Sequence, residues 1–242
     1  MAASAGRLLL ILLGLLSIQP ATSQLINLEE GLVACYLFNG TADDVSGNLN
    51  HGTVVGPVLT ADRFNNENSA FYFDGVDDYI VVEDADMLSF PSQEFSIAFW
   101  LDPYSLDHSF WLYKGSDRSN REYAFGLRPD KLASVHISNE GSADVQYGTP
   151  SNTTIQLSEW VHIVGTWDGS FLSIYINGHL ENQLIYSAIV GNYDSDLFIG
   201  TFGGAITEYA FQGVIDDIYI YNRVINLCEI EALYSGMLLD ER

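Results

Sequence analysis

Basic residues are scarce in this chain. Lysine and arginine together number 9 of the 242 residues, against 32 aspartates and glutamates, and the formal net charge is −23. Nucleic acids and anionic lipid surfaces are both bound through clusters of basic side chains, so this composition disfavours both classes of partner. A strongly negative protein instead attracts cations, which makes calcium or a calcium-rich surface a predicted partner.

Long apolar runs are also rare. The extended run Leu8 to Leu16 follows Arg7, the only charged residue among the first 28, and precedes the small residues up to Ser23. This order is typical of a secretory signal peptide cleaved after Ser23. A membrane anchor is the alternative, but the run is shorter than the ~20 residues that span a bilayer. We predict a signal peptide over 1–23 and a secreted, extracellular domain over 24–242.

Cysteine occurs only at Cys35 and Cys228, near opposite ends of the predicted mature chain. In an oxidising compartment the two thiols can pair, and the alternative is two separately buried thiols. Closing so long a loop would stabilise the fold by roughly 5 kcal/mol as an upper limit. Two sequons, which begin at Asn39 and Asn152, are predicted glycosylation sites.

Helical spacing is confined to residues 226–234, where Asn226 is a plausible N-cap. The rest of the mature chain shows alternating apolar residues and turn dipeptides such as Asn177-Gly178, which predicts a hairpin. Short strands at regular spacing, with no linker between them, predict one all-β domain built as a β-sandwich. The clearest strand patterns are 32–38, 95–100, 160–164 and 171–176.

Several segments, taken together, resemble laminin-G-like, concanavalin A-like jelly-roll domains. The segments are 31–40 with 44–52, 73–80, 95–103, 160–169 with 175–178, 199–200 and 213–223. Their order and spacing cover residues 31–235. The resemblance implies two packed antiparallel sheets in a jelly roll, related to pentraxins and legume-type lectins. The helical spacing at 226–234 adds one short C-terminal helix to this expectation. The resemblance also implies that the first and last strands are neighbours, which favours a Cys35–Cys228 disulfide.

Catalytic patterns are weak. Glycoside hydrolysis needs two carboxylates that flank the scissile bond. Some glucanases of this superfold carry them as E-x-D-x-x-E, which the sequence lacks. His162 lies inside the hairpin pattern of the family, where a structural role is expected. The sequence therefore predicts no catalytic residues and no enzyme, and leaves a glycoside hydrolase or lyase as the third-ranked alternative.

Metal binding is better supported. Asp44, Ser46, Asn48 and Asn50 place oxygen atoms at alternate positions of one loop, and calcium takes six to eight oxygen ligands. The resemblance implies a structural calcium between this loop and the last strand, with Asp217 or Asp216 as a second carboxylate. We predict Asp44, Asn48 and Asp217 as its ligands. Ordinary Asx turns in the loop are the alternative, and Asp77 and Asp78 are rival donors.

The sequence favours a recognition module that binds glycans or extracellular matrix proteins, with calcium as a structural aid. Carbohydrate sites combine aromatic platforms with polar loops, which singles out residues 104–111 and 117–123. An acidic structural protein of the extracellular matrix, associated with calcified material, is the alternative, because a dense carboxylate surface binds many calcium ions weakly. No subunit interface is visible in the sequence.

Overall fold

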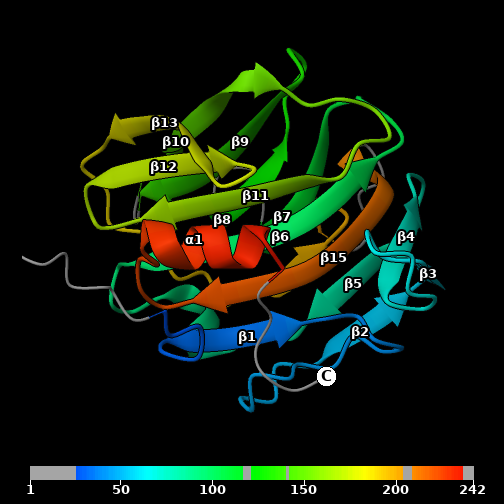
Figure 1. Cartoon of the computed structure of the whole chain (residues 1–242). Helices are drawn as coiled ribbons and strands as arrows, with labels where there is room; N and C mark the ends of the chain where they lie inside the picture. The colour runs from blue at the N-terminus through cyan, green and yellow to red at the C-terminus, as the bar shows by residue number, and fades with distance from the viewer. Residues whose placement is uncertain (1–25, 117–120, 140–141, 204–208, 237–242) are drawn as a thin grey trace, which may run out of the picture.

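The computed structural model describes residues 26–116, 121–139, 142–203 and 209–236. The predicted signal peptide over 1–23 lies outside the described residues. Two antiparallel sheets lie face to face, which confirms the predicted sandwich (Figure 1). No helix in the described ranges is long and apolar enough to cross a membrane.

The first sheet carries the central strands of the chain. In spatial order its strands are β13 (His179–Ile185), β12 (Phe171–Ile176), β11 (Val161–Trp167), β6 (Phe95–Pro103), β15 (Gln212–Tyr221), β4 (Ala70–Asp74) and β3 (Val58–Thr60). The last part of β15 also pairs with β1 (Leu32–Tyr36), so the first and last strands are neighbours as the resemblance implied.

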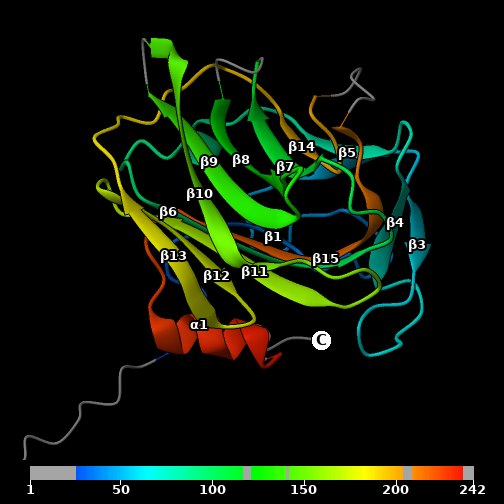
Figure 2. The same cartoon turned by 90° about the horizontal axis from the view of Figure 1, so that it is seen from above.

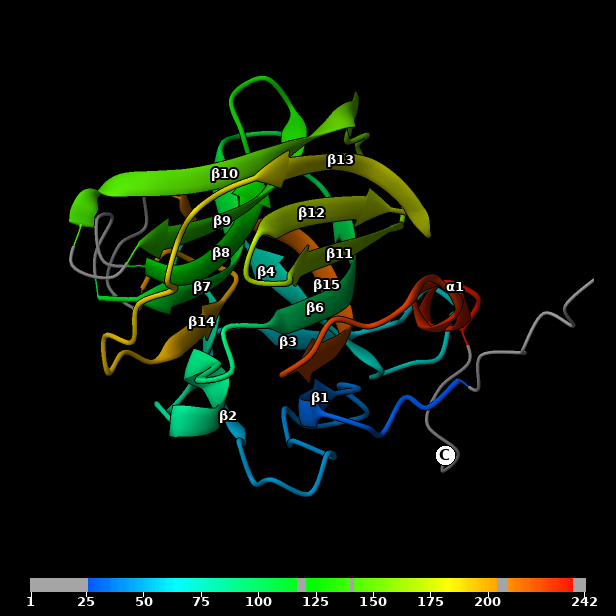
Figure 3. The ribbon, with the colours of Figure 1, turned by 90° about the vertical axis from the view of Figure 1, so that its left-hand side faces the viewer.

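The second sheet faces the first across the core. Its order is β10 (Ser142–Thr154), β9 (Leu132–Asn139), β8 (Arg121–Leu127), β7 (Ser109–Gly115), β14 (Leu197–Ile199), β5 (Tyr79–Val82) and β2 (Gly52–Val55). Figure 3 shows β10, β9, β8, β7 and β14 side by side in this sheet. A short 3₁₀ helix, η1 (Asp86–Ser89), follows β5.

Alternation along β6 explains how both faces of the first sheet are buried. Phe95, Ile97, Phe99 and Leu101 join the core between the sheets. Ala98 joins a second apolar cluster with residues of α1 (Leu227–Tyr234). Figure 2 shows α1 on the side of the first sheet that faces away from the second. A strand in the middle of this sheet therefore needs apolar side chains on both faces.

The predicted turn and helix are both confirmed. Asn177 and Gly178 connect β12 to β13 with φ angles of 50° and 80°, the left-handed pair that a two-residue hairpin turn requires. Asn226 caps α1 by accepting hydrogen bonds from the backbone N–H groups of Cys228 and Glu229. In turn, the Glu229 carboxylate accepts a hydrogen bond from the backbone N–H of Asn226. This reciprocal capping box fixes where the helix begins.

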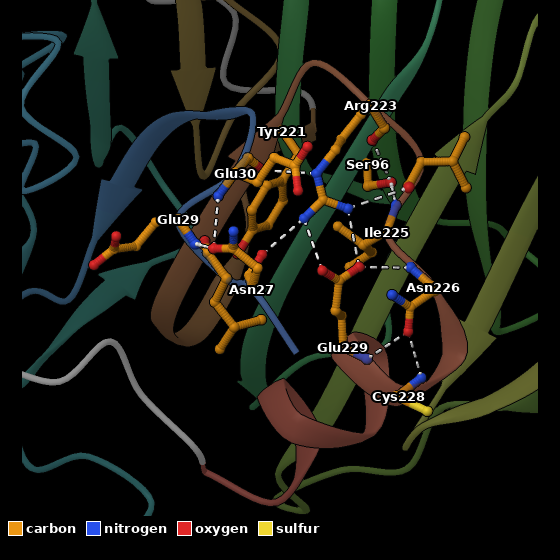
Figure 4. Close-up of polar contacts among 12 residues, drawn as sticks. Asn27, Glu29, Glu30, Ser96, Tyr221, Arg223, Ile225, Asn226, Cys228 and Glu229 are labelled. Atoms are coloured by element: carbon orange, nitrogen blue, oxygen red, sulfur yellow. Dashed lines mark hydrogen bonds and ion pairs between the residues drawn. The ribbon is translucent and has the colours of Figure 1, made fainter. Parts of the chain in front are cut away.

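An arginine joins α1 to the N-terminal segment (Figure 4). Arg223 donates two hydrogen bonds to the Glu229 carboxylate, at 2.9 and 2.8 Å, and further bonds to the carbonyl oxygens of Asn27 and Glu30. Its guanidinium also lies 5.4 Å from the ring centroid of Tyr221. One side chain thereby holds together the start of the described chain, the end of β15 and the first turn of α1.

The predicted disulfide is not formed in the structure. Cys35 is fully buried in β1, where it packs in the apolar cluster beneath α1, whereas Cys228 is exposed on the helix. The inner face of α1 is occupied by Ile230 and Leu233, which leaves Cys228 on the solvent side. The two cysteines belong to neighbouring elements, but the helix turns one of them away from the other.

Thiol reactivity tests this arrangement. A thiol reagent added to folded, mature protein should label Cys228 rapidly and Cys35 only after unfolding, because attack requires an accessible thiolate. The Cys228→Ser variant should lose the rapid phase and keep the slow one. Absence of any reactive thiol in the unreduced, unfolded protein would contradict the structure and restore the disulfide.

Candidate functional site

The predicted calcium ligand Asp44 is already fully hydrogen-bonded. Its Oδ1 accepts from the backbone N–H groups of Cys35 and Ser46, and its Oδ2 accepts from the Ser46 hydroxyl and the backbone N–H of Asn50, all at 2.9–3.0 Å. The carboxylate is 5% exposed. These four donors give the Asx-turn network that was the alternative, and calcium binding by Asp44 stays a prediction.

The other two predicted ligands divide between different networks. Asn48 lies beside Asp44, but its amide donates to the carbonyl oxygens of Leu32 and Val33. Asp217 pairs with Arg63 at 2.7 Å, next to Asp216 at 3.0 Å. The structure therefore brings Asp44 and Asn48 into one hydrogen-bond network through Ser46 and gives Asp217 a different partner, and the calcium ion shared by the three stays a prediction.

A different group of carboxylates has the geometry of a metal site. Asp74, Asp77 and Asp78 each offer an oxygen within 4.8 Å of the others. Burial raises the pKa of Asp78, and the neighbouring carboxylates of Asp74 and Asp77 raise it further, against the backbone hydrogen bond from Asp74. Asp74 also accepts a turn hydrogen bond from the N–H of Val76. The sequence named Asp77 and Asp78 only as rivals, because Asp74-Gly75 is ordinary turn chemistry.

The loops predicted to bind glycans are only partly exposed. Tyr104 is 45% exposed and packs against Tyr72, with 5.8 Å between ring centroids, whereas Trp111 is fully buried in the core. In the second loop, residues 117–120 lie outside the described ranges, and 121–123 are buried. His162 is buried beside Trp100, and burial lowers its pKa to about 3, which supports a neutral, structural ring.

Both predicted glycosylation sites lie on the surface. Asn39 and Asn152 are exposed, and the Asn152 side chain donates to the carbonyl oxygen of Glu181 in β13. Their modification remains a prediction.

A cavity of about 380 Å³ lies between the segment that follows β5 and the segment that leads into β14. Its wall is formed by η1, the segment after it and the segment that leads into β14, with Asp86, Ser89, Pro91, Gln93, Val190 and Asn192 as lining residues. The Gln93 amide makes two hydrogen bonds to the backbone of Val190, at 3.1 and 2.6 Å. Gln93 therefore joins the two sides of the cavity and uses both ends of its amide to do so.

A cluster of buried charged side chains lies next to the cavity wall. Lys114, at the end of β7, is fully buried and contacts Asp84, the carbonyl oxygen of Ser195 and, at 3.3 Å, Glu122. Glu122 is also fully buried and accepts a hydrogen bond from the N–H of Tyr193. Burial raises the pKa of Glu122, and Lys114 lowers it in part. This cluster fixes the segment that leads into β14.

A buried hydroxyl links the cavity wall to this charged cluster. Ser89 lines the cavity, is 4% exposed and forms a hydrogen bond with the Glu122 carboxylate. The cluster that fixes the segment leading into β14 therefore also fixes the end of η1. The sequence carried one signal for this site, namely charged residues within otherwise apolar strands at positions 114 and 122.

Solved structures share this fold. Domain 4 of a GH43 extracellular arabinanase from Geobacillus stearothermophilus, in complex with arabinotriose, superposes with a TM-score of 0.63 at 20% identity, covering 84% of this chain and 98% of that domain. The binding domain of a Paraclostridial mosquitocidal protein gives 0.68 at 17%, over 87% of this chain. The binding domain of botulinum neurotoxin DC, in complex with SialylT, gives 0.69 at 15%, over 88%. This chain spans about half the length of the two toxin structures, 53% in each case.

A match to a family profile shows which family this chain belongs to and corrects one prediction. Residues 73–231 match the family described as the concanavalin A-like lectin/glucanases superfamily. No curated protein matches the sequence. The prediction that the chain is not an enzyme is contradicted, because this family includes glucanases and one structural neighbour is a domain of an arabinanase. The missing E-x-D-x-x-E pattern is too narrow a criterion for so diverse a family. The chain belongs to the laminin-G-like branch of the concanavalin A-like lectin/glucanase superfamily.

Proposed function

We propose that the chain is a secreted recognition protein that binds a glycan in the cavity between η1 and the segment leading into β14. The observation that carries this proposal is the cavity itself, whose wall combines the exposed carboxylate of Asp86 with the polar side chains of Ser89 and Asn192. A cavity of about 380 Å³ lies within the range of small-ligand sites, roughly 300–1,000 Å³. Sugar hydroxyl groups both donate and accept, so a sugar ring can form hydrogen bonds with the polar groups of this wall.

The structural neighbours support a glycan as the class of ligand. One is a domain in complex with arabinotriose, and another is a binding domain in complex with SialylT. Function in this fold depends on the site, so the glycan proposal rests on the cavity and takes only its ligand class from the neighbours.

Ser89→Ala tests the site directly. The variant should bind its glycan about tenfold more weakly, because one hydrogen bond to the ligand contributes about 1.5 kcal/mol. Its melting temperature should also fall slightly, since the hydroxyl forms a hydrogen bond with the buried Glu122 carboxylate. A glycan array with the mature chain identifies the ligand, and calorimetry gives the two affinities. Equal affinity in both proteins would contradict the proposed location.

The calcium part of the proposal belongs at Asp74, Asp77 and Asp78. Calcium binds carboxylate oxygens at about 2.3–2.6 Å, so oxygens within 4.8 Å of one another can share one ion. A cation would also favour the ionised form of Asp78, whose pKa is raised by burial and, to a smaller extent, by repulsion from Asp74 and Asp77. The role is structural, because these residues lie on β4 and the turn that follows it.

Thermal unfolding in EDTA and in calcium tests this site. Calcium at about a hundred times its Kd should add roughly 2.7 kcal/mol and raise the melting temperature by about 5–10 °C. Asp77→Asn should abolish most of the rise, whereas Asp43→Asn, an equal charge change at an exposed residue, should preserve it. The same melting temperature in both solutions would remove calcium from the proposal.

A further inference from the structure

A half-buried carboxylate on the outer face of the first sheet has no hydrogen-bond donor in the described part of the chain. Asp102 lies near the end of β6 and faces away from the core, and its Oδ1 is buried without a partner. Burial raises the pKa of Asp102, and no donor or cation among the described residues lowers it. By contrast, Asp44 accepts four hydrogen bonds and Glu229 pairs with Arg223. An ionised carboxylate in such a position is costly unless a partner supplies a donor or a cation.

Two tyrosine rings border this carboxylate. Tyr104 is 45% exposed, and its ring centroid lies 5.8 Å from that of Tyr72 on β4. The buried Val214, on β15, pairs with Asp102 on one side and with Tyr72 on the other. Figure 1 shows β6, β15 and β4 side by side in this order. The apolar cluster beneath α1 reaches β6 at Ala98, so the helix covers a different part of these strands.

The same sheet face already holds a guanidinium group with the same kinds of side chain. The Cζ atom of Arg63 lies 4.6 Å from the ring centroid of Trp100 and 4.4 Å from that of Phe64. Its Nη1 donates hydrogen bonds to the carboxylates of Asp216 and Asp217, at 3.0 and 2.7 Å. Trp100 and Asp216 are paired across β6 and β15. Two rings and adjacent carboxylates therefore bind one arginine on this face.

The surface around Asp102 repeats this arrangement two residues further along β6, with no basic side chain from the described residues in contact. Tyr72 and Tyr104 supply the rings, and Asp102 supplies the carboxylate. The faces of aromatic rings carry partial negative charge, so a cation is attracted both by the rings and by the carboxylate. A guanidinium group suits this set because it is planar, stacks on rings and donates two parallel hydrogen bonds to a carboxylate.

We infer that this surface docks an arginine side chain of a basic partner protein, stacked on Tyr104 and hydrogen-bonded to the Asp102 carboxylate. The net charge of −23 attracts a basic partner and repels a second copy of this chain. The inference goes beyond the proposed function, because neither residue lines the cavity beside η1.

The probe is a blocked glycine peptide with one central arginine, and its control carries citrulline, whose neutral urea group has nearly the same shape. NMR titration of the mature chain, followed at the backbone amides of Asp102 and Tyr104, gives both affinities. The wild type should bind the arginine peptide about tenfold more tightly, because the ion pair and the contact with the ring both need the positive charge.

Three variants test the named residues. Asp102→Asn should reduce the preference for arginine to about twofold or less, whereas Asp43→Asn, an equal charge change at an exposed residue, should keep it. Tyr104→Ala should weaken binding of the arginine peptide about fivefold. Asp102→Asn should also raise the melting temperature at neutral pH, because a carboxyl whose folded-state pKa is raised destabilises the fold once it ionises.

Four results would each overturn the inference. The arginine peptide does not bind, or the citrulline peptide binds equally well, which would indicate a surface for neutral groups. The preference falls equally in Asp102→Asn and Asp43→Asn, so that only the overall charge acts. The melting temperature of Asp102→Asn falls, which would mean that its carboxylate has a donor in the folded protein. All four leave the glycan proposal standing, because that proposal is tested at Ser89 in the cavity wall.

Discussion

Replacement of Arg223 by Met should lower the free energy of unfolding by about 3–5 kcal/mol, the usual cost of removing one partner from a buried ion pair. Glu229 is the partner, and its side chain is 3% exposed. Burial by itself would raise the pKa of Glu229, but the hydrogen bonds from Arg223 and Asn226 lower it below the ordinary value. Without Arg223 the carboxylate would stay buried with little compensation.

The loss should extend beyond the ion pair. Arg223 also donates to the carbonyl oxygens of Asn27 and Glu30, so the variant should release the N-terminal segment from α1. Guanidinium-induced unfolding gives the free energy, and amide exchange of residues 27–31 reports the release. Arg128→Met is the matched control, because the Arg128–Asp130 pair is 41% and 48% exposed and should contribute little to stability. An equal loss of unfolding free energy in both variants would mean that the buried contacts of Arg223 stabilise the fold no more than an exposed ion pair does.

The fold was predictable because its signals are local. Alternation in β6 and the Asn177-Gly178 dipeptide each specify a conformation over a few residues. Neighbouring first and last strands followed from the family resemblance and are confirmed by the pairing of β1 with β15. Whether the disulfide forms also depends on which face of α1 carries Cys228. The order of the strands does not contain this information.

The Asp44 loop shows why ligand sets are harder to predict. Oxygen side chains at alternate positions suit calcium and suit a network of hydrogen bonds equally well. The hydrogen bonds of Asp44 include one from the N–H of Cys35, nine residues away in the sequence. This donor reaches Asp44 Oδ1 only in the folded chain, so the sequence alone does not reveal it. The cavity is still harder to predict from the sequence. The Lys114 side chain beside it contacts Asp84 and Ser195, which lie 30 and 81 residues away along the chain.

Lys114→Met should also destabilise the fold by about 3–5 kcal/mol at neutral pH, and its effect should depend on pH. The variant leaves Glu122 fully buried without its cation, so the folded-state pKa of this carboxyl rises further above its unfolded value. A group with a raised folded pKa contributes its full stability below the unfolded pKa and loses it as pH rises. Both proteins should lose about 1.4 kcal/mol per pH unit from about pH 4.5 upward, because the folded-state pKa of Glu122 is raised in both. The variant should go on losing stability relative to wild type above the wild-type folded pKa, until Glu122 ionises in its own folded state.

Guanidinium unfolding of both proteins across this pH range measures the slope. The double variant Lys114→Met with Glu122→Gln should recover much of the lost stability and remove the pH dependence, because no charge is then left buried beside the cavity. A pH-independent loss in the single variant would mean that Lys114 acts through packing of its aliphatic chain. A loss that follows the ionisation of Glu122 would instead show that the segments around the cavity are held by a charge pair whose carboxyl cannot be ionised without Lys114.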